Sequence, residues 1–438
     1  MAATYVSVET LPMLPGRLPL VGHTLQMLRS FPELIFAGRE RFGPLFRIDG
    51  GRIRDTVVIA DLEGMRLLAG RQVSSDAMND AGGPVLEDSI ITQDGARHRR
   101  QRTVLQRPFV PRGLDMTTVG DLIAEETAAC IAGWRREAPI PILVDMQRVA
   151  LKILFRMIGC EARELDEWTK LYGRLMLGSF GVPGLGQVSR QAQRELHRRL
   201  GQIVAAKRES GEQDSLLGKM ANTTDEDGEL LPLEELVSTL RVMVLAGHET
   251  SATSAAWGVI ELARNPEFWK RLVAEAETVE RPPRTTAEFE QTPFALAYAR
   301  EIVRRHSPVA SLVRRLREDI DLLGHRLPAG AAIMTPVVML NIDPELFDDP
   351  LAIRPERWLD ESTVMKGREL ERLAFGLTGP HFCIGYHLAL LELVHIFVAV
   401  AKTFAARNWI PSLRGGTVKR RAAFPLVQPS RKTTIWID

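Results

Sequence analysis

The feature that most constrains this chain is a glycine-rich turn that carries one cysteine and runs directly into an apolar helical pattern. The turn reads Phe-Gly-Leu-Thr-Gly-Pro-His-Phe-Cys-Ile-Gly over residues 375–385, and the apolar pattern follows over residues 386–400. Glycines let the main chain take positive φ and approach a ligand closely. The following helix places the positive end of its dipole beside the sulfur of Cys383, which favours the thiolate. The turn therefore predicts a thiolate exposed under a flat ligand, with a buried, inert cysteine as the alternative.

A second constraint is a long helical pattern, predicted from Leu233 to Arg264. Acidic residues after an initial proline are typical of a helix start, and an Asn-Pro pair follows the predicted end. At ~1.5 Å per residue, this helix would span roughly 45 Å and cross a whole domain. Its middle reads Ala-Gly-His-Glu-Thr over residues 246–250, a combination that helix propensity disfavours. Either Gly247 permits close helix packing while Glu249 is solvated, or the segment has a chemical role.

Two further segments place charged side chains at helical spacing. Glu301 and Arg304 share one face of a helix predicted over residues 295–305, where an exposed pair would be worth about 0.2–0.5 kcal/mol. His98 and Arg102 are also one turn apart, so both could reach the same anionic group. The simpler interpretations are a surface ion pair for the first segment and a solvated basic face for the second.

Taken together, these segments resemble the cytochrome P450 family, whose cysteine loop reads Phe-x-x-Gly-x-(His or Arg)-x-Cys-x-Gly. Gly379, His381 and Gly385 fall on the family positions. Phe375 stands one residue too far upstream, so the loop holds one extra residue.

The resemblance runs from Leu14 to the end of the chain and implies one fold. The implied fold is mainly α-helical with small β-sheets. It forms a single unit over residues 1–438, in which the long central helix lies over a haem. Residues 1–13 are expected to be loosely ordered. Residues 74–90 and 178–188 are predicted to be loops by their turn-forming residues. In the family these positions form the substrate lid and the entry channel.

Each motif then has an implied role. Cys383 would be the axial ligand of haem b, because thiolate ligation favours O–O cleavage. Glu249 and Thr250 would deliver protons on the distal side of the haem, where Ala246 and Gly247 leave room for O₂. The other residues implied to bind the haem are Phe375, Gly379, His381, Gly385, His98, Arg102 and either Arg314 or Arg315, between which the sequence does not choose.

The resemblance also implies a structural cluster and a substrate pocket. Glu301, Arg304 and Arg357 would form a buried triad, because two planar guanidinium groups can pair with one carboxylate. All but one of the implied pocket residues are apolar, which indicates a lipophilic substrate. The residues implied to line the pocket are Val242, Met243, Val309, Ser311, Leu312, Phe424 and Leu426.

The implied activity is that of a soluble, bacterial-type haem-thiolate monooxygenase, which inserts one atom of O₂ into a lipophilic small molecule. The chain contains no flavin or iron-sulfur motif. The electrons would therefore come from a separate ferredoxin or flavodoxin. Arg97, Arg99 and Arg100 are the candidate docking residues for such an acidic donor.

Two alternatives come from other classes of protein. A peroxide-driven or O₂-independent haem-thiolate enzyme would not need the proton-delivering pair Glu249-Thr250. A non-catalytic haem or metal sensor could instead place zinc on His381, Cys383 and His387. Structural zinc sites have four protein ligands, so a cluster of only three side chains disfavours the metal sensor.

Composition limits the partners and the compartment. A net charge of +1 gives no overall attraction to nucleic acid or to a membrane surface. Three cysteines argue against a disulfide framework and for a reducing, cytoplasmic location. The first ten residues lack the apolar run of a membrane span, so no membrane anchor is expected.

Overall fold

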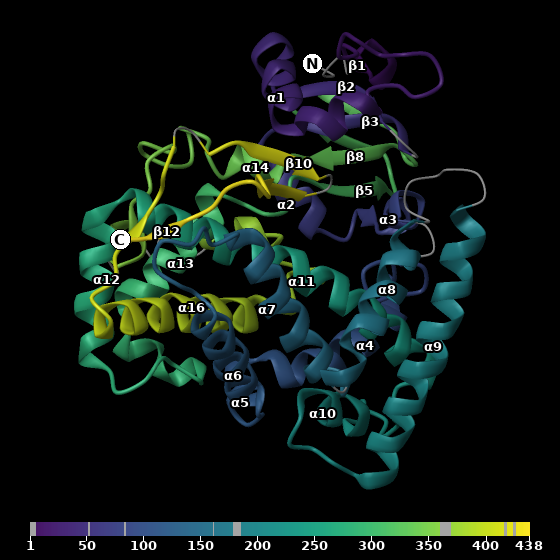
Figure 1. Cartoon of the computed structure of the whole chain (residues 1–438). Helices are drawn as coiled ribbons and strands as arrows, with labels where there is room; N and C mark the ends of the chain where they lie inside the picture. The colour runs from purple at the N-terminus through teal and green to yellow at the C-terminus, as the bar shows by residue number, and fades with distance from the viewer. Residues whose placement is uncertain are drawn as a thin grey trace.

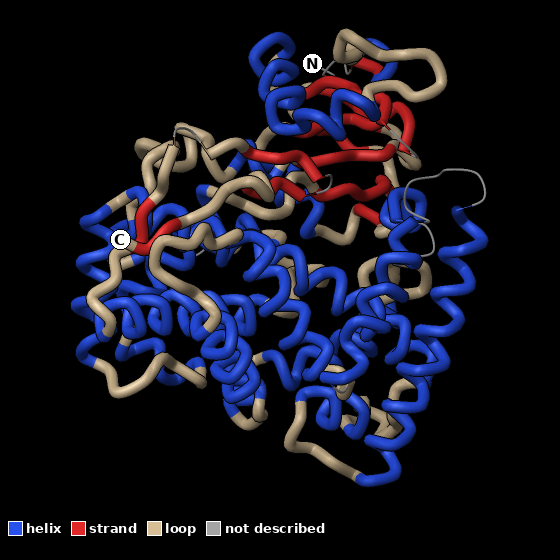
Figure 2. Tube along the Cα trace, in the orientation of Figure 1, coloured by secondary structure: helices blue, strands red, loops and turns tan. Residues whose placement is uncertain are grey.

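Helices and strands occupy separate parts of the molecule. The computed structural model describes residues 6–50, 53–82, 85–160, 162–177, 185–359, 369–415, 418–423 and 426–438. Figure 1 and Figure 2 show a large body of helices, with most of the strands gathered on one side of it near the N-terminus. The mainly helical class with small sheets is therefore confirmed.

The strands form small sheets, and the largest has the order β2-β3-β8-β5-β4. In it β3 and β8 run parallel, whereas the other neighbouring pairs are antiparallel. Its strands are β2 (Leu45–Gly50), β3 (Ile53–Ile59), β8 (Ala332–Thr335), β5 (Leu312–Leu316) and β4 (Val73–Ser74). The smaller sheets pair β1 (Val6–Ser7) with β7 (His325–Leu327) and β6 (Ile320–Leu322), β10 (Arg420–Ala423) with β11 (Leu426–Pro429), and β9 (Pro411–Ser412) with β12 (Trp436–Ile437).

The helices carry most of the chain. They are α1 (Thr24–Phe42), α2 (Leu62–Ala69), α3 (Asp76–Gly82), α4 (Gly95–Gln106), α5 (Pro111–Asp115), α6 (Val119–Ala132), α7 (Ile142–Met157), α8 (Leu165–Met176), α9 (Leu185–Ser210), α10 (Leu216–Asn222), α11 (Leu233–Arg264), α12 (Pro266–Thr278), α13 (Pro293–Arg305), α14 (Val337–Leu340) and α16 (Tyr386–Ala406).

The N-terminal segment is more ordered than expected. Residues 1–5 lie outside the described residues, but β1 pairs in parallel with β7. The side chain of Leu11 is buried, and Met13 forms a bridge with Arg47 of β2. The expectation of a loosely ordered segment is therefore wrong for residues 6–13, because pairing with distant strands supplies an order that no local pattern shows.

Both segments predicted to be loops contain helix. Within residues 74–90, residues 76–82 form α3, which packs against β5. Residues 178–184 lie outside the described residues, and residues 185–188 form the first turn of α9. The loop predictions are wrong for these parts, because α3 is held by a contact with a distant strand rather than by an apolar repeat of its own.

The central helix has the predicted bounds, Leu233 to Arg264. Figure 1 shows α11 passing through the middle of the helical body. At Gly258 it approaches α16 so closely that a Cβ atom would overlap the ring of Phe397. The hydroxyl of Tyr298, on α13, donates a hydrogen bond to the Gly258 carbonyl at 2.6 Å. These contacts fix the C-terminal half of α11 against two other helices.

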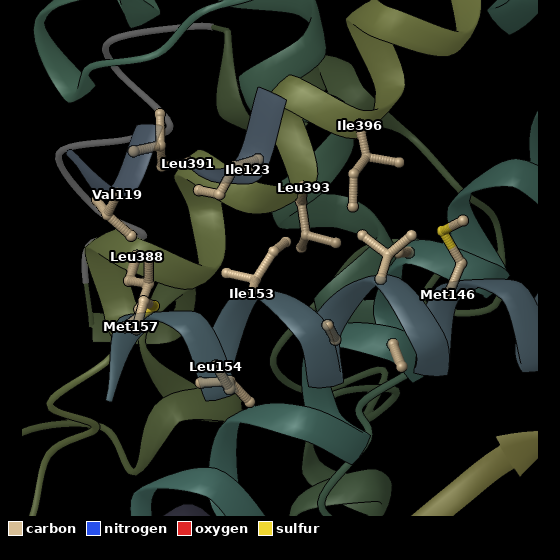
Figure 3. Close-up of a cluster of buried hydrophobic side chains, with 14 of the residues drawn as sticks. Val119, Ile123, Met146, Ile153, Leu154, Met157, Leu388, Leu391, Leu393 and Ile396 are labelled. Atoms are coloured by element: carbon tan, nitrogen blue, oxygen red, sulfur yellow. The ribbon is translucent and has the colours of Figure 1, made fainter. Parts of the chain in front are cut away.

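The helix that follows the cysteine turn belongs to the core. By length and by a mean hydropathy of 1.9, α16 could cross a membrane, but 78% of its most apolar window is buried inside the protein. Figure 3 shows Leu391 and Leu393 of α16 in one cluster with Ile123 of α6 and Ile153 of α7. Because such cores are closely packed, they hold the N-terminus of α16, and with it the preceding turn, in place.

Candidate active site

The cysteine turn folds back so that Cys383 is hydrogen-bonded to its start. The Cys383 N–H donates to the Phe375 carbonyl at 2.9 Å. Gly376 and Gly379 have φ values of 94° and 89°, a conformation that favours glycine. Any side chain at Gly379 would also collide with the carbonyl of Ala69, at the end of α2. The turn therefore needs glycine at these two positions.

The extra residue is accommodated between Phe375 and Gly379. Leu377 also takes a positive φ of 64°, its N–H donates to the Arg372 carbonyl at 2.8 Å, and its side chain is buried. The ring of Phe375 lies edge-on against that of Tyr386, with centroids 4.9 Å apart. Phe375 therefore keeps contact with the first turn of α16 in spite of the insertion.

The sulfur of Cys383 faces opposing influences. Burial raises the pKa of the Cys383 thiol, and this outweighs both the N–H of Gly385 and the positive charge of Arg102. A side chain at Gly385 would reach the sulfur. A thiol in these surroundings is deprotonated when it coordinates a metal cation.

Basic side chains from separate elements converge beside this turn. The rings of His98, on α4, and His381 have centroids 4.1 Å apart. Burial, together with the nearby His381 and Arg102, lowers the pKa of His98 to about 4. Arg314 of β5 is buried, and its Nε has no hydrogen-bond partner among the described residues. Burial lowers the pKa of Arg314 to about 10. A buried guanidinium with a free donor calls for an anion.

Asp94 orients this cluster and was not predicted to do so. Its Oδ1 lies 3.2 Å from Nε2 of His381, and its Oδ2 accepts from the Ser75 N–H at 2.7 Å. Burial alone would raise the pKa of Asp94, but the bonds to His381 and Ser75 hold this pKa well below its usual range. Asp94 directly precedes α4, yet its side chain makes no capping bond to that helix.

The structure decides between the two candidate arginines of β5. Successive side chains of a strand point to opposite faces, so Arg314 and Arg315 diverge. Arg315 donates to the Asp80 carboxylate at 2.9 Å and to the Gly330 carbonyl at 2.8 Å. Arg315 is therefore engaged on the other face of the strand, which favours Arg314 as the candidate that faces the haem.

On α11 a short accessible stretch interrupts buried residues. Residues 251–260 are all buried, whereas residues 245–250 are not, and Ala246 is exposed although α11 runs through the middle of the protein. This stretch is therefore accessible in the structure, and we call it the opening on α11. The hydroxyl of Thr250 donates to the Ala246 carbonyl at 2.6 Å. Gly247 instead faces α7, where a Cβ atom would lie 3.0 Å from the side chain of Leu154, so close helix packing explains this glycine.

Glu249 is held by two glutamines. Its Oε2 accepts from Nε2 of Gln147, on α7, at 2.8 Å and from Nε2 of Gln428, on β11, at 2.5 Å. The interpretation of Glu249 as a solvated side chain is therefore wrong. Sequence reasoning missed both glutamines, because they are 102 and 179 residues away from Glu249 in the chain and no motif connects them.

The three members of the predicted charged triad are in contact. Glu301 is fully buried, and Arg304 donates to its two oxygens at 2.9 and 2.7 Å. Nε of Arg357 reaches Oε1 at 3.3 Å. The indole N–H of Trp358 and the main-chain N–H of Arg354, which were not predicted, add bonds of 2.9 and 2.8 Å. The alternative of an exposed surface pair is wrong.

The residues predicted to line a pocket are brought together in part. Val309 and Leu426 form a β-bridge, so segments far apart in the chain meet there. On α11, Val242 is buried and Met243 is partly buried. Phe424 lies outside the described residues.

Ser311, directly before β5, and Leu312, its first residue, differ in their surroundings. The side chain of Leu312 lies next to Gly376, so it borders the cysteine turn. Ser311 is buried, and its hydroxyl has no hydrogen-bond partner among the described residues. Among the described residues, the Ser311 hydroxyl is therefore a buried polar group that no other group satisfies.

Two of the three predicted docking arginines have partners within the protein. Arg97 pairs with Glu235 at 2.9 Å, and Arg100 pairs with Asp225 at 2.6 Å. Arg99 is exposed. Arg97 is exposed as well, and the Arg100 side chain is 38% exposed, so the docking role of these three arginines stays a prediction.

The zinc alternative lacks a suitable cluster. Within the part of the chain that the structure describes, no group of three or more His, Cys, Asp or Glu side chains could hold a metal ion. His381 turns toward Asp94 and Ser75, with Nε2 3.0 Å from the Ser75 hydroxyl. The three proposed ligands His381, Cys383 and His387 thus do not form a zinc site.

The site fits a flat ligand that carries both a metal and carboxylates. Cys383 offers a sulfur ligand at the end of a rigid turn, and Arg314 offers a buried, unpaired donor beside it. His98, Arg102 and His381 add basic groups around Arg314. A haem has an iron that binds thiolate and two propionates that pair with basic groups.

Comparisons with known proteins agree with this fit. The family model described as Cytochrome P450 matches residues 12–162 and 185–408. A cytochrome P450 BJ-4 homolog of Sinorhizobium fredii is 33% identical over 425 residues, covering 96% of this chain and 94% of the relative. Cyclooctat-9-en-7-ol 5-monooxygenase of Streptomyces melanosporofaciens is 28% identical, covering 90% and 89%. The solved structure of a cyanobacterial CYP120A1 has a TM-score of 0.82 at 21% identity, covering 98% and 99%.

Proposed function

Because the chain belongs to the cytochrome P450 family and is a haem-dependent monooxygenase, we propose that it binds haem b through Cys383 and oxidises a lipophilic small molecule. The observation that carries the site assignment is the buried, unpaired donor of Arg314 beside the turn that holds Cys383. The bound haem would supply activation of O₂, with one oxygen atom entering the product and the other leaving as water.

The residues around the haem have separate tasks in this proposal. His98, Arg102, His381 and Arg314 bind the propionates. Asp94 fixes the orientation of His381 through the contact between its Oδ1 and Nε2. The cluster of Glu301, Arg304 and Arg357 holds the segment before the cysteine turn to α13, so its task is structural.

Thr250 and Glu249 of α11 supply protons in this proposal. The hydroxyl of Thr250 borders the opening beside Ala246 and can turn toward a ligand there by giving up its single bond to the Ala246 carbonyl. The carboxylate of Glu249 lies next to it in sequence, is partly accessible, and can exchange protons with solvent. A peroxide-driven enzyme would need neither group.

The substrate class rests on the character of the pocket. Val242, Val309 and Leu426 offer apolar surface, and Ser311 offers one unpaired hydroxyl. A relative named for oxidation of cyclooctat-9-en-7-ol supports a lipophilic substrate. We therefore assign a carbon-rich small molecule, with Ser311 as a single polar anchor.

An acidic ferredoxin or flavodoxin supplies the electrons in this proposal. A recess of about 460 Å³ lies beside the start of α16 and is lined by residues that include Arg112, Tyr386 and His387. Tyr386 and His387 follow Cys383 by three and four residues, and Arg112 is exposed. This recess is the docking surface that we assign to the donor. Three free cysteine thiols are consistent with a cytoplasmic setting for both proteins.

One spectrum tests the assignment of the haem and its ligand. The reduced protein with carbon monoxide should show the absorbance band of thiolate-ligated haem. Arg314→Leu should retain less haem after gel filtration than wild type, whereas Arg315→Leu, its neighbour on the opposite face, should retain as much. Equal haem retention by the two variants would contradict the role given to Arg314.

A further inference from the structure

Among the residues that the structure describes, the carboxylate of Glu249 accepts hydrogen bonds at one oxygen only. Oε2 accepts both amide hydrogen bonds, from Gln147 at 2.8 Å and from Gln428 at 2.5 Å. Oε1 has Nδ1 of His248 at 3.7 Å, which is beyond hydrogen-bonding distance. One oxygen is therefore fully engaged, and the other is available.

Both amides are themselves fixed by the fold. Gln428 is buried within β11. The residue before it in the same strand, Val427, donates its N–H to the Pro308 carbonyl at 2.9 Å. Gln147 lies on α7, which packs along α11 and contacts it closely where Leu154 faces Gly247. The two donors reach Glu249 from a helix and from a strand, so the packing of two separate elements sets where the amides lie.

The chemistry of the donors matters as well as their place. An amide N–H donates without bringing a charge and does not titrate, so it orients a carboxylate while favouring the charged form less than an ion pair would. A lysine or arginine in the same place would form an ion pair and hold the carboxylate in its charged form. Neutral donors thus suit a carboxylate that has to take up and release a proton.

We propose that Gln147 and Gln428 are positioning residues for the monooxygenase reaction, which hold Oε2 of Glu249 so that Oε1 is the oxygen that exchanges protons at the opening on α11. This inference rests on the proposed role of Glu249 and Thr250 in supplying protons. Neither glutamine touches the substrate or the haem. They act through the rotamer of Glu249, because without them its side chain would be free to turn away from the opening.

The test uses variants that keep side-chain size but remove the donors. Gln147→Leu, Gln428→Leu and the double variant should bind haem and substrate as wild type does, with spectral Kd values within about twofold. Product formation should fall about tenfold or more in the double variant, because positioned acid–base groups contribute about 10²–10⁴-fold. A larger share of the electrons should leave as hydrogen peroxide. Gln193→Leu is the matched control, since the Gln193 amide bonds an exposed carboxylate, that of Glu87, on another part of the surface.

A readout that does not depend on turnover separates positioning from general damage. The infrared C–O stretch of the reduced protein with carbon monoxide reports the polarity of the opening on α11. It should broaden or shift in the double variant and stay unchanged in Gln193→Leu. An unchanged band together with wild-type yield of product per electron would overturn the inference.

The Glu249→Gln background distinguishes this inference from the proposal on which it depends. If Glu249 supplies protons, Glu249→Gln alone should lower product formation, and adding Gln147→Leu and Gln428→Leu should lower it little further, since coupled residues are not additive. A Glu249→Gln variant with wild-type turnover would remove the proposed role of Glu249. An impaired Glu249→Gln variant beside fully active glutamine variants would remove only the positioning role.

Discussion

Cys383 is the residue whose replacement changes the chemistry most and the packing least. Cys383→Ser keeps the N–H that bonds the Phe375 carbonyl, so the turn should fold as before. Serine is not deprotonated at neutral pH, and we expect the thiolate band of the reduced carbon monoxide complex and product formation to disappear together. Absorbance spectra and a product assay measure the two effects, and circular dichroism checks that the variant is folded. A variant with the wild-type band would contradict the assignment of the ligand.

Glu301 should matter for stability rather than for the rate of catalysis. Glu301→Gln leaves Arg304 and Arg357 with an uncompensated charge next to a fully buried position. Breaking a buried pair in this way costs about 3–5 kcal/mol, so haem uptake should be lost. Denaturant unfolding measures the lost stability, and absorbance measures the bound haem. The exposed pair of Glu369 and Arg66 is the control. Glu369→Gln should change the free energy of unfolding by less than about 1 kcal/mol.

Glu392 should make stability depend on pH. It is buried on α16, and burial raises its pKa to about 7, in spite of a hydrogen bond with Ser251 of α11. A carboxyl group whose pKa is raised by folding stabilises the protein in its neutral form. This contribution is full below the unfolded pKa and is lost as pH rises through 7.

Unfolding measured from pH 5 to pH 8 tests the role of Glu392. At about 1.4 kcal/mol per pKa unit, the wild type should lose about 3 kcal/mol over this range because of Glu392. Glu392→Gln, which stays neutral, should show a flatter profile. Parallel profiles for the two proteins would mean that Glu392 is not buried in this way.

Single residues were predictable from sequence where a motif fixed their surroundings. The turn around Cys383 and the Glu301–Arg304 pair depend on contacts within a few residues, and the structure has both. Arg315 could not be assigned from sequence. Which of two adjacent arginines faces inward depends on how β5 is oriented in its sheet, and no motif encodes that orientation.

At the scale of elements, Arg241 joins three parts of the fold. It is fully buried on α11 and donates to the Glu87 carbonyl in the turn after α3 and to Nε2 of His197 on α9. Arginine only donates, so His197 accepts at Nε2 and carries its proton on Nδ1, which faces Glu234 at 3.4 Å.

Removing Arg241 should therefore loosen α9 and the turn around residue 87 without unfolding the core. Arg241→Met keeps the aliphatic volume but loses both bonds. Hydrogen exchange should become faster in these two segments and stay slow in α16, because local opening follows the contacts that hold a segment. Arg198→Met, which removes an exposed pair with Glu195 on α9, is the control and should leave exchange unchanged. Equal protection in both variants would contradict the role of Arg241.

Elements were predictable when their signals were local. The bounds of α11 follow from a proline start, first-turn acids and the Asn-Pro end, all of which act within one turn. β1 and α3 lack such signals, because β1 depends on β7, more than three hundred residues away, and α3 depends on β5. A pattern within one segment carries no information about a partner in another.

At the scale of the molecule, the same limit applies to the site. The residues expected at the haem came from motifs, but the groups that orient them did not. Asp94 reaches His381 across 287 residues, and Gln428 reaches Glu249 across 179. These contacts exist only because the start of α4 meets the cysteine turn, and α7 and β11 meet α11, in the folded protein.

The position of the electron donor is also a property of the assembled surface. We expect Arg112→Glu to slow reduction by an acidic ferredoxin severalfold at low ionic strength, mainly by lowering the association rate, because basic rims steer acidic partners. The difference from wild type should shrink as salt is added, since the Debye length is about 10 Å at 0.1 M. Stopped-flow reduction at two salt concentrations measures both effects, while the ferric spectrum and substrate affinity should stay unchanged.

The exposed Arg99 allows the recess beside α16 to be compared with the face of α4. If the donor docks over the recess, Arg112→Glu should slow reduction more than Arg99→Glu does, because Arg112 lines the recess together with residues three and four positions after Cys383. Arg97→Glu is less informative, since it also breaks the pair with Glu235. Wild-type rates for Arg112→Glu beside slow reduction of Arg99→Glu would place the donor on α4 instead.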